Sequence, residues 1–538
     1  MTPMKTASFS FTSILCCFTF TLPSRGDESL LPPNTSIAKA IDHYIRANWQ
    51  DKNIKPSQPA DDFTWLRRVS LDLVGRIPTP REARAFAQDN DPTKKTKTID
   101  HLMKSPGHIR HQAREFENHL MNGTRGQLLG YLGKALGENR SWDKIFREIL
   151  VADESNANAK GASEFLKVRV KDLDRLTNDV SVAFFGVNVS CAQCHDHPLV
   201  QDWKQDHFFG MKSFFSRTYE VGTFLAEREY GVVRFLPNKG KEKQADYMFL
   251  TGKKVDPPGL TEPSKDEQKK EKEKVEKWKK EKTPPPKAKV STRAMLVDLA
   301  LSPKEQGYLA RAIINQLWNR FYGQGLVMPL DQMHSENPPS HPELLAWLER
   351  DFVTHQFDIS RLVRGMVSSE TYALSSEYNG GGNSPLAKDF AVARLRPLTP
   401  MQLAVALKQA GLIIPLKDLE KKTEEVDRSA GGLAEQFQYP NENFQIGVNE
   451  ALFLSNSSRF QNECLPEGND RLVTAMVKET SLQEKADLAI FSVLGRPGTM
   501  DEKSAIAAYL NSHGKNELAA CKQVVWSLMA SPEFRFNH

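Results

Sequence analysis

The chain has 538 residues, too many for one hydrophobic core, so we expect two or three domains. Its 39% hydrophobic and 26% charged residues are ordinary for a globular protein and exclude a disordered or fibrous one. The formal net charge of +5 comes entirely from residues 265–289, which hold eleven Lys against six acidic residues. We therefore expect no nucleic-acid partner and no anionic-membrane partner.

The first residues have the pattern of a secretory signal peptide. A short start containing Lys5 is followed by the uncharged, partly apolar stretch 7–24, and then by acidic residues at 27–28. We expect residues 1–25 to be removed and the protein to be exported, for example to the periplasm, with no stable membrane span afterwards. An uncleaved anchor is the alternative.

Removing that peptide leaves too few cysteines for a disulfide framework. Four remain, namely Cys191, Cys194, Cys464 and Cys521. Pairing between the last two in an oxidising compartment stays open.

Residues 36–237 are expected to form a first helical domain. Apolar side chains recur at helical spacing over residues 37–45 and again from Phe63 to Leu73. Thr79-Pro80-Arg81-Glu82 has the form of a capping box with Pro at the first helical position. A further helix is predicted over Trp142–Val151.

Residues 238–292 differ in composition, with alternating Lys and Glu over residues 265–282 followed by three consecutive Pro. Such a segment buries too little apolar surface to offset the entropy of ordering. We expect a charged, partly disordered linker or insertion, partly helical at most.

Residues 293–538 are expected to form a second helical domain. Apolar residues from Ala310 to Phe321 mark one helix face. Capping boxes are predicted at Ser340-His341-Pro342-Glu343 and at Thr399-Pro400-Met401-Gln402. The fold class is therefore mainly α, with two helical domains, and no internal repeat is evident.

One motif carries recognisable chemistry. Cys191-Ala192-Gln193-Cys194-His195 has the Cys-x-x-Cys-His pattern of covalent haem attachment, typical of c-type cytochromes. Thiols one helical turn apart are suitably spaced to bond the two vinyl groups of one haem. The imidazole of His195 then lies next to the iron. The prediction is an exported haem c protein that transfers electrons to a redox partner of unknown identity.

Three alternatives remain open for this motif. Cys191, Cys194 and His195, with His197 and His207, supply ligands suited to zinc or iron without haem. Such a site would suit a metal-dependent extracellular enzyme or a structural, binding protein. The cysteines also have the spacing of a dithiol–disulfide pair, or they are purely structural.

The sequence does not identify the second axial ligand of the iron. Met211 would raise the reduction potential and His207 would lower it. His197 lies two residues from His195 and points away on a helix, so Asp196 and His197 are predicted to orient the ligands by hydrogen bonds.

Few other residues suggest chemistry. Arg67, Arg68 and Asp72 have the spacing of a structural ion pair on a helix. His334 and His341 flank an Asn-Pro-Pro corner, where surface capping is expected. No catalytic residue is predicted, and whether the protein is an enzyme stays open.

The chain resembles large exported proteins, abundant in planctomycetes, that join a cytochrome-c-like domain to a C-terminal domain of unknown function. The resemblance extends over nearly the whole chain beyond the signal peptide. It rests on these strings: Leu66-Arg67-Arg68-Val69, residues 72–80, residues 191–198, Ala310 to Trp318, residues 325–327, residues 337–345, residues 396–400 and Ser531-Pro532-Glu533-Phe534. It implies export and a haem site at Cys191, Cys194 and His195, but no reaction.

Overall fold

A computed structural model describes residues 30–124, 126–196, 200–259, 261–440 and 445–538. Of these, 56% are helical and 5% lie in strands, which confirms the mainly α prediction. No helix in the described ranges is both long and apolar enough to cross a bilayer. The predicted signal peptide and His197 lie outside the described residues.

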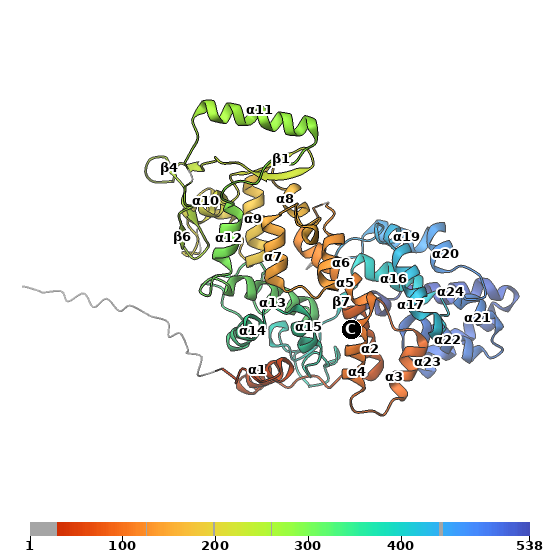
Figure 1. The fold of residues 1–538 in the computed structure, drawn as a ribbon. Helices are drawn as coiled ribbons and strands as arrows, with labels where there is room; N and C mark the ends of the chain where they lie inside the picture. Colours follow the sequence, from red (N-terminus) through yellow and green to blue (C-terminus); the bar gives the residue numbers. More distant parts are fainter. Residues whose placement is uncertain (1–29, 125, 197–199, 260, 441–444) are drawn as a thin grey trace, which may run out of the picture.

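The first part of the chain is a succession of helices that pack into one body (Figure 1). They are α1 (Ile37–Asp51), α2 (Asp62–Val74), α3 (Pro80–Gln88), α4 (Lys94–Lys104), α5 (Pro106–Met121), α6 (Leu129–Gly137), α7 (Trp142–Val151), α8 (Glu164–Lys167), α9 (Leu173–Phe185) and α10 (Gln205–Ser213). The 3-10 turns η2 (Ala157–Ala159) and η3 (Ser190–Gln193) interrupt the series. The capping box at Thr79 is present with both of its hydrogen bonds, and α7 has the predicted bounds.

Short hairpins and one exposed helix follow α10. They are β1 (Thr218–Val221), β2 (Phe224–Glu227), β3 (Arg234–Phe235), β4 (Lys243–Gln244), β5 (Tyr247–Met248), β6 (Lys254–Val255) and α11 (Lys265–Glu281). No residue of α11 is buried, and Val275 and Trp278 pack loosely on the β1–β2 hairpin. Figure 1 shows α11 at the outer edge of the molecule.

The segment predicted as a charged linker is therefore helical where Lys and Glu alternate. It also reaches the interior, because Phe249 is fully buried and its ring lies 5.1 Å from that of Phe185. Averaging the composition over residues 238–292 concealed this short apolar run, Tyr247 to Leu250.

The remaining elements are again mainly helical. They are α12 (Thr292–Ala300), α13 (Gly307–Tyr322), α14 (Pro342–Thr354), α15 (Ile359–Val367), η4 (Ala387–Asp389), β7 (Arg396–Pro397), α16 (Pro400–Ala410), η5 (Leu416–Asp418), α17 (Leu419–Ser429), α18 (Gly431–Ala434), α19 (Val448–Asn456), α20 (Ser458–Cys464), α21 (Leu472–Lys478), α22 (Leu482–Leu494), α23 (Met500–Ser512), η6 (Gly514–Asn516), α24 (Glu517–Met529), α25 (Pro532–Arg535) and β8 (Phe536–Asn537).

One of the two further predicted capping boxes does not form. Thr399 caps α16 as predicted, with Gln402 completing the box. At α14 the capping position is occupied by His341, which makes no side-chain capping bond, and Ser340 lies one residue outside. Pro342 explains the difference: the Pro takes the first helical position, so the residue directly before it becomes the cap.

Two large hydrophobic clusters form the interior. The first runs from Ile37 to Ala391 with Phe491, so side chains from both sides of residues 238–292 share it. The second is built from residues 398–534 together with Leu71 and Ile77. Helix α2 contributes to both clusters and is buried from Trp65 to Val74.

The structure reveals an internal repeat that the sequence analysis missed. Helices α2 and α22 both have 13 residues and end at a left-handed glycine, Gly75 or Gly495. The next residue, Arg76 or Arg496, binds a glutamate six residues on with two hydrogen bonds of 2.7–2.9 Å. That glutamate also completes the capping box of the next helix, α3 or α23.

We call the two copies of this repeat units. Each unit continues into a third helix, α4 or α24. A Ser-Pro pair follows that helix, and its Ser caps the next one. The two units pack against each other, since the Phe63 and Phe491 rings lie 5.6 Å apart. The repeat was hard to see because the two units share few residues, mainly at turns and caps.

Candidate functional site

The Cys-x-x-Cys-His motif lies just beyond the end of α9, on the 3-10 turn η3. The chain leaves α9 through Gly186, whose left-handed conformation (φ 66°) ends the helix. The Asn188 side chain then accepts hydrogen bonds from the Ser190 amide and hydroxyl, at 3.1 and 2.6 Å. These bonds stop the chain from continuing as a strand and start the turn that carries the two cysteines.

The two thiols lie close together in the sequence at this turn. Cys191 belongs to the turn, and Cys194 directly follows its last residue, Gln193. Cys191 and Cys194 are both exposed with free thiols, whereas Ala192 between them is buried. The turn thus anchors itself through Ala192 and presents both sulfur atoms to solvent.

His195 follows directly and is also exposed. Its Nδ1 lies 2.8 Å from the Asp196 carbonyl oxygen, so Nδ1 carries the proton and donates it. A hydrogen bond of this kind leaves Nε2 as the atom with a lone pair for a metal ion. The donor set therefore fits a covalently attached haem, with two exposed thiols three residues apart and an imidazole prepared to bind iron through Nε2.

Gln205, at the start of α10, holds the motif from the other side. Its Nε2 donates to the Cys194 carbonyl oxygen at 3.2 Å, and its backbone N–H donates to the Asp196 carboxylate at 3.0 Å. Gln193 of the motif donates to Asp174 of α9 at 2.9 Å. Asp196 thus contacts both His195 and Gln205, and the contribution of Gln205 was missed because glutamine has no recognisable motif.

A loop between α13 and α14 supports the same turn. Asn188 donates from its backbone N–H to the Asp331 carbonyl oxygen at 2.8 Å and from its side chain to the Asp331 carboxylate at 2.9 Å. Ser335 donates from its N–H and its hydroxyl to Asp202, both at 2.8 Å. The C-terminal region therefore fixes both ends of the motif segment.

The two suggested axial ligands lie on α10. Met211 is fully buried in the main hydrophobic cluster, whereas His195 is exposed, so the Met211 thioether does not face the solvent side of the turn. His207 is half-buried, and its Nδ1 accepts the Lys204 backbone N–H at 3.1 Å. Burial lowers the pKa of His207, which favours the neutral imidazole.

Within the described residues, no group of three His, Cys, Asp or Glu side chains is arranged to hold a metal ion. The zinc or iron alternative thus gains no geometric support from this part of the chain.

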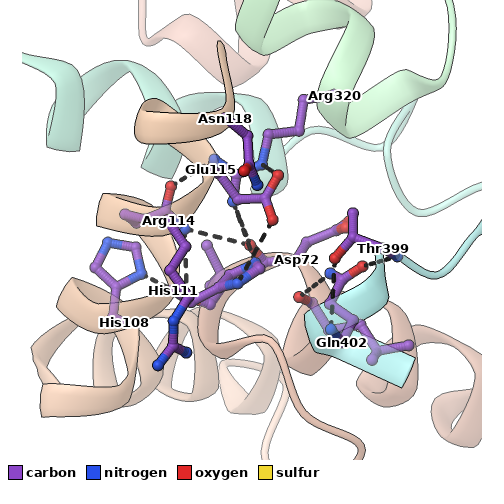
Figure 2. A network of polar contacts seen from close by, with 12 residues as sticks. Asp72, His108, His111, Arg114, Glu115, Asn118, Arg320, Thr399 and Gln402 are labelled. Carbon is purple, nitrogen blue, oxygen red and sulfur yellow. Dashed lines mark hydrogen bonds and ion pairs between the residues drawn. The ribbon is translucent and has the colours of Figure 1, made fainter. Parts of the chain in front are cut away.

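Asp72 is the centre of a buried polar network (Figure 2). The predicted ion pair with Arg67 or Arg68 is wrong, because Asp72 binds Arg396 instead with two hydrogen bonds of 2.8 and 2.7 Å. Arg68 donates to the Leu374 carbonyl oxygen at 2.8 Å. Helix α2 is buried on all sides, so its polar side chains bind distant segments rather than one another.

Figure 2 shows His111 and Gln402 on either side of Asp72, and Glu115 facing Arg320. Burial and the neighbouring Arg320 hold the pKa of His111 well below its ordinary value, and burial raises the pKa of Glu115. Gln402 donates to the Leu71 carbonyl oxygen at 2.9 Å. These contacts connect α2, α5, α13 and α16, which is a structural role.

His341 was expected at the surface but is 95% buried, with its ring against that of Phe390. Burial lowers its pKa to about 4, so it is neutral near pH 7. Its position results from Pro342, which is the first residue of α14 and makes His341 the capping residue of that helix.

Comparisons with known proteins match two separate parts of the chain to family models. Residues 40–220 match the family described as PSCyt2, protein of unknown function (DUF1549), and residues 292–410 match PSD1, protein of unknown function (DUF1553). No curated protein and no solved structure matches the chain. The chain therefore carries the two domains that are typical of planctomycete-type proteins of unknown function.

Proposed function

We propose that this is an exported protein that binds one haem covalently through Cys191 and Cys194 and transfers electrons. The observation that supports it is the presence of two exposed, free thiols three residues apart, one in a 3-10 turn and one directly after it, followed at once by an exposed imidazole. Bound haem would supply a reversible one-electron couple at its iron.

The protein's own part in the attachment is simple. Cys191 and Cys194 would hold the haem if each thiol added across one vinyl group, with sulfur bonding to one vinyl carbon and the thiol proton going to the other, which needs no oxidant. His195 would hold the iron through Nε2, because its Nδ1 donates to the Asp196 carbonyl oxygen. Gln205 and Asn188 hold the turn in place from its two ends.

The exposure of the site favours electron transfer over chemistry on a bound substrate. A substrate-binding site is normally concave and encloses its ligand. All three haem-binding side chains are exposed. An exposed haem edge allows close approach of a redox partner.

The test is to express the full chain with a haem-maturation system and to record a pyridine haemochrome spectrum and the intact mass. We expect a mass increase of one haem, with loss of covalent haem in Cys191→Ser plus Cys194→Ser. Cys464→Ala is the matched control, because Cys464 is buried in the other cluster, and it should retain haem.

A folded protein with no haem contradicts the proposal. In that case metal analysis decides the alternative: zinc or iron bound by the parent and lost in Cys191→Ser would indicate a metal site in an extracellular enzyme or binding protein.

A further inference from the structure

Helix α19 carries apolar side chains on both of its faces. Phe453 and Leu454 face inward and pack against the second hydrophobic cluster, and the indole N–H of Trp526 donates to the Leu454 carbonyl oxygen at 2.7 Å. Val448 and Leu452 lie one turn apart on the opposite face, and they are 75% and 52% exposed. A helix that is apolar all round is normally buried all round, so the outer face of α19 lacks a cover.

The segment that precedes α19 extends this outer face. Tyr439 and Ile446 are 50% and 51% exposed. The residues next to them in the chain lie close together, since a Cβ atom added to Gly447 would be 4.0 Å from the side-chain oxygen of Gln438. Figure 1 shows α19 at the upper edge of the C-terminal elements. We define the α19 face as Tyr439, Ile446, Val448 and Leu452.

The α19 face is a concentration of exposed apolar side chains. Nine large hydrophobic side chains are exposed in the described part of the chain, and four of them lie within residues 439–452. Single exposed apolar residues are ordinary, whereas a group of them marks a contact surface.

This face carries no charge. In residues 436–440 and 445–458 the only charged residue is Glu450, which is turned inward and pairs with Arg535 at 3.1 Å, each side chain being 5% exposed. The exposed polar residues around the face are amides and a hydroxyl, each of which both donates and accepts hydrogen bonds. They are Gln438, Gln445, Asn449, Ser455 and Asn456.

A second copy of this chain suits such a face. In a two-fold contact the same surface meets itself, so a charged surface would be repelled by its copy, whereas a neutral apolar one is attracted. Amides that both donate and accept can pair with the same amides of the copy. Helices that lie on a membrane surface typically carry Lys or Arg beside their apolar face, and α19 has neither. A charged partner would find no complementary charge here.

We propose that the α19 face is the interface of a homodimer, in which α19 of one chain packs against α19 of the other. This inference goes beyond the proposed haem function and does not depend on it. The nine residues of α19 span about 13 Å at 1.5 Å per residue. A contact of that length buries less than the roughly 800 Å² per partner of a stable complex, so the dimer should dissociate on dilution.

The first test is sedimentation velocity of the full chain over a roughly 100-fold range of concentration. The average mass should rise from that of one chain toward that of two. Val448→Asp and Leu452→Asp should each weaken the dimer at least about 10-fold, because the contact would enclose unpaired carboxylates. Met500→Asp is the matched control, since Met500 is 76% exposed on α23, and its replacement should leave the dimer unchanged.

The mass of one chain at every concentration would overturn the homodimer. A dimer that is as stable in Val448→Asp and Leu452→Asp as in the parent would overturn the α19 face as its interface.

The second test locates the contact by crosslinking. It uses the Cys191→Ser/Cys194→Ser background, which removes the exposed thiols. Ser455→Cys on α19 should join two chains through a bismaleimide, whereas Ser504→Cys, which is exposed on α23, should not. Equal crosslinking at the two positions contradicts the interface. Binding of the parent to phosphatidylcholine vesicles that is lost in Val448→Asp would show that lipid covers the face, and it would reject the homodimer.

Discussion

Asp72 shows how strongly one buried carboxylate connects distant parts of this chain. Its two oxygens accept four hydrogen bonds, two from Arg396 and one each from Tyr372 and Asn537, at 2.6–2.9 Å. A buried charge is tolerated only when it is paired and fully hydrogen-bonded. The partners lie 300 to 465 residues away along the chain, so Asp72 helps to define the tertiary structure.

Replacing Asp72→Asn should lower the free energy of unfolding by about 3–5 kcal/mol, because the buried guanidinium of Arg396 loses its counter-charge. Urea unfolding followed by circular dichroism measures the change. Asp256→Asn is the matched control, since Asp256 is exposed and unpaired among the described residues, and it should cost at most about 0.5 kcal/mol. Similar midpoints for the two variants would show that the Asp72 pair contributes little.

At the level of single residues, the sequence shows the candidate motif but not the residues that support it. Cys191, Cys194 and His195 are visible because their spacing is rare and specific. Gln205, Asp331 and Ser335 are not, because any polar residue can brace a loop and only the folded chain shows which ones do. The partner of Asp72 was missed for the same reason: local spacing favours Arg68, whereas burial selects Arg396.

The two repeated units are the most informative elements. Gly75 and Gly495 end equivalent helices with φ of 70° and 77°, a conformation that glycine adopts without strain. Their surroundings differ. A Cβ atom added to Gly75 would lie 2.6 Å from Nδ1 of His111, whereas one added to Gly495 would meet only Pro78, at 3.8 Å.

This pair allows strain and crowding to be separated. Gly495→Ala should cost about 1 kcal/mol, the penalty of the left-handed conformation alone. Gly75→Ala should cost about 1–3 kcal/mol more, because the methyl group must displace a buried ring. Thermal and urea unfolding of both variants give the difference. Equal losses would mean that the His111 ring moves aside at no cost.

Two helix starts were predictable from local capping residues. Thr79 and Thr399 precede a Pro and are followed by Glu or Gln at the third helical position, and both caps form. The hairpins β3 to β6 were not predictable, because strands of two residues leave no periodic pattern. The role of Phe249 was hidden by the charged residues around it, since composition averages over a window wider than the buried run.

For the whole molecule, the histidines dominate the expected response to acid. His108, His119 and His341 have their pKa lowered to about 4, each chiefly by burial, and His111 is shifted in the same direction. In the unfolded chain each imidazole titrates near pH 6.5. Between those values the unfolded state binds more protons than the folded state, so stability is lost as the pH falls from about 6.5 to 4.

Between pH 6.5 and 4, His108→Asn should reduce the slope of the unfolding free energy against pH. The reduction should be at most the contribution of one bound proton, about 1.4 kcal/mol per pH unit. Urea unfolding at several pH values between 7.5 and 4 measures the slope. His513→Asn is the control for the substitution itself, because His513 is exposed. An unaltered slope in His108→Asn would show that His108 binds protons equally in the folded and unfolded states.

The burial of α2 also sets the order of events during synthesis. Arg67 donates to the carbonyl oxygen of Phe534, 467 residues later, at 3.0 Å. At ordinary translation speeds these two residues leave the ribosome roughly 25 to 90 s apart. Throughout that interval Arg67 lacks its acceptor and Leu71 lacks the C-terminal cluster in which it is buried. A holding chaperone would therefore find its most persistent target in this early helix, and the last helices to emerge would release it.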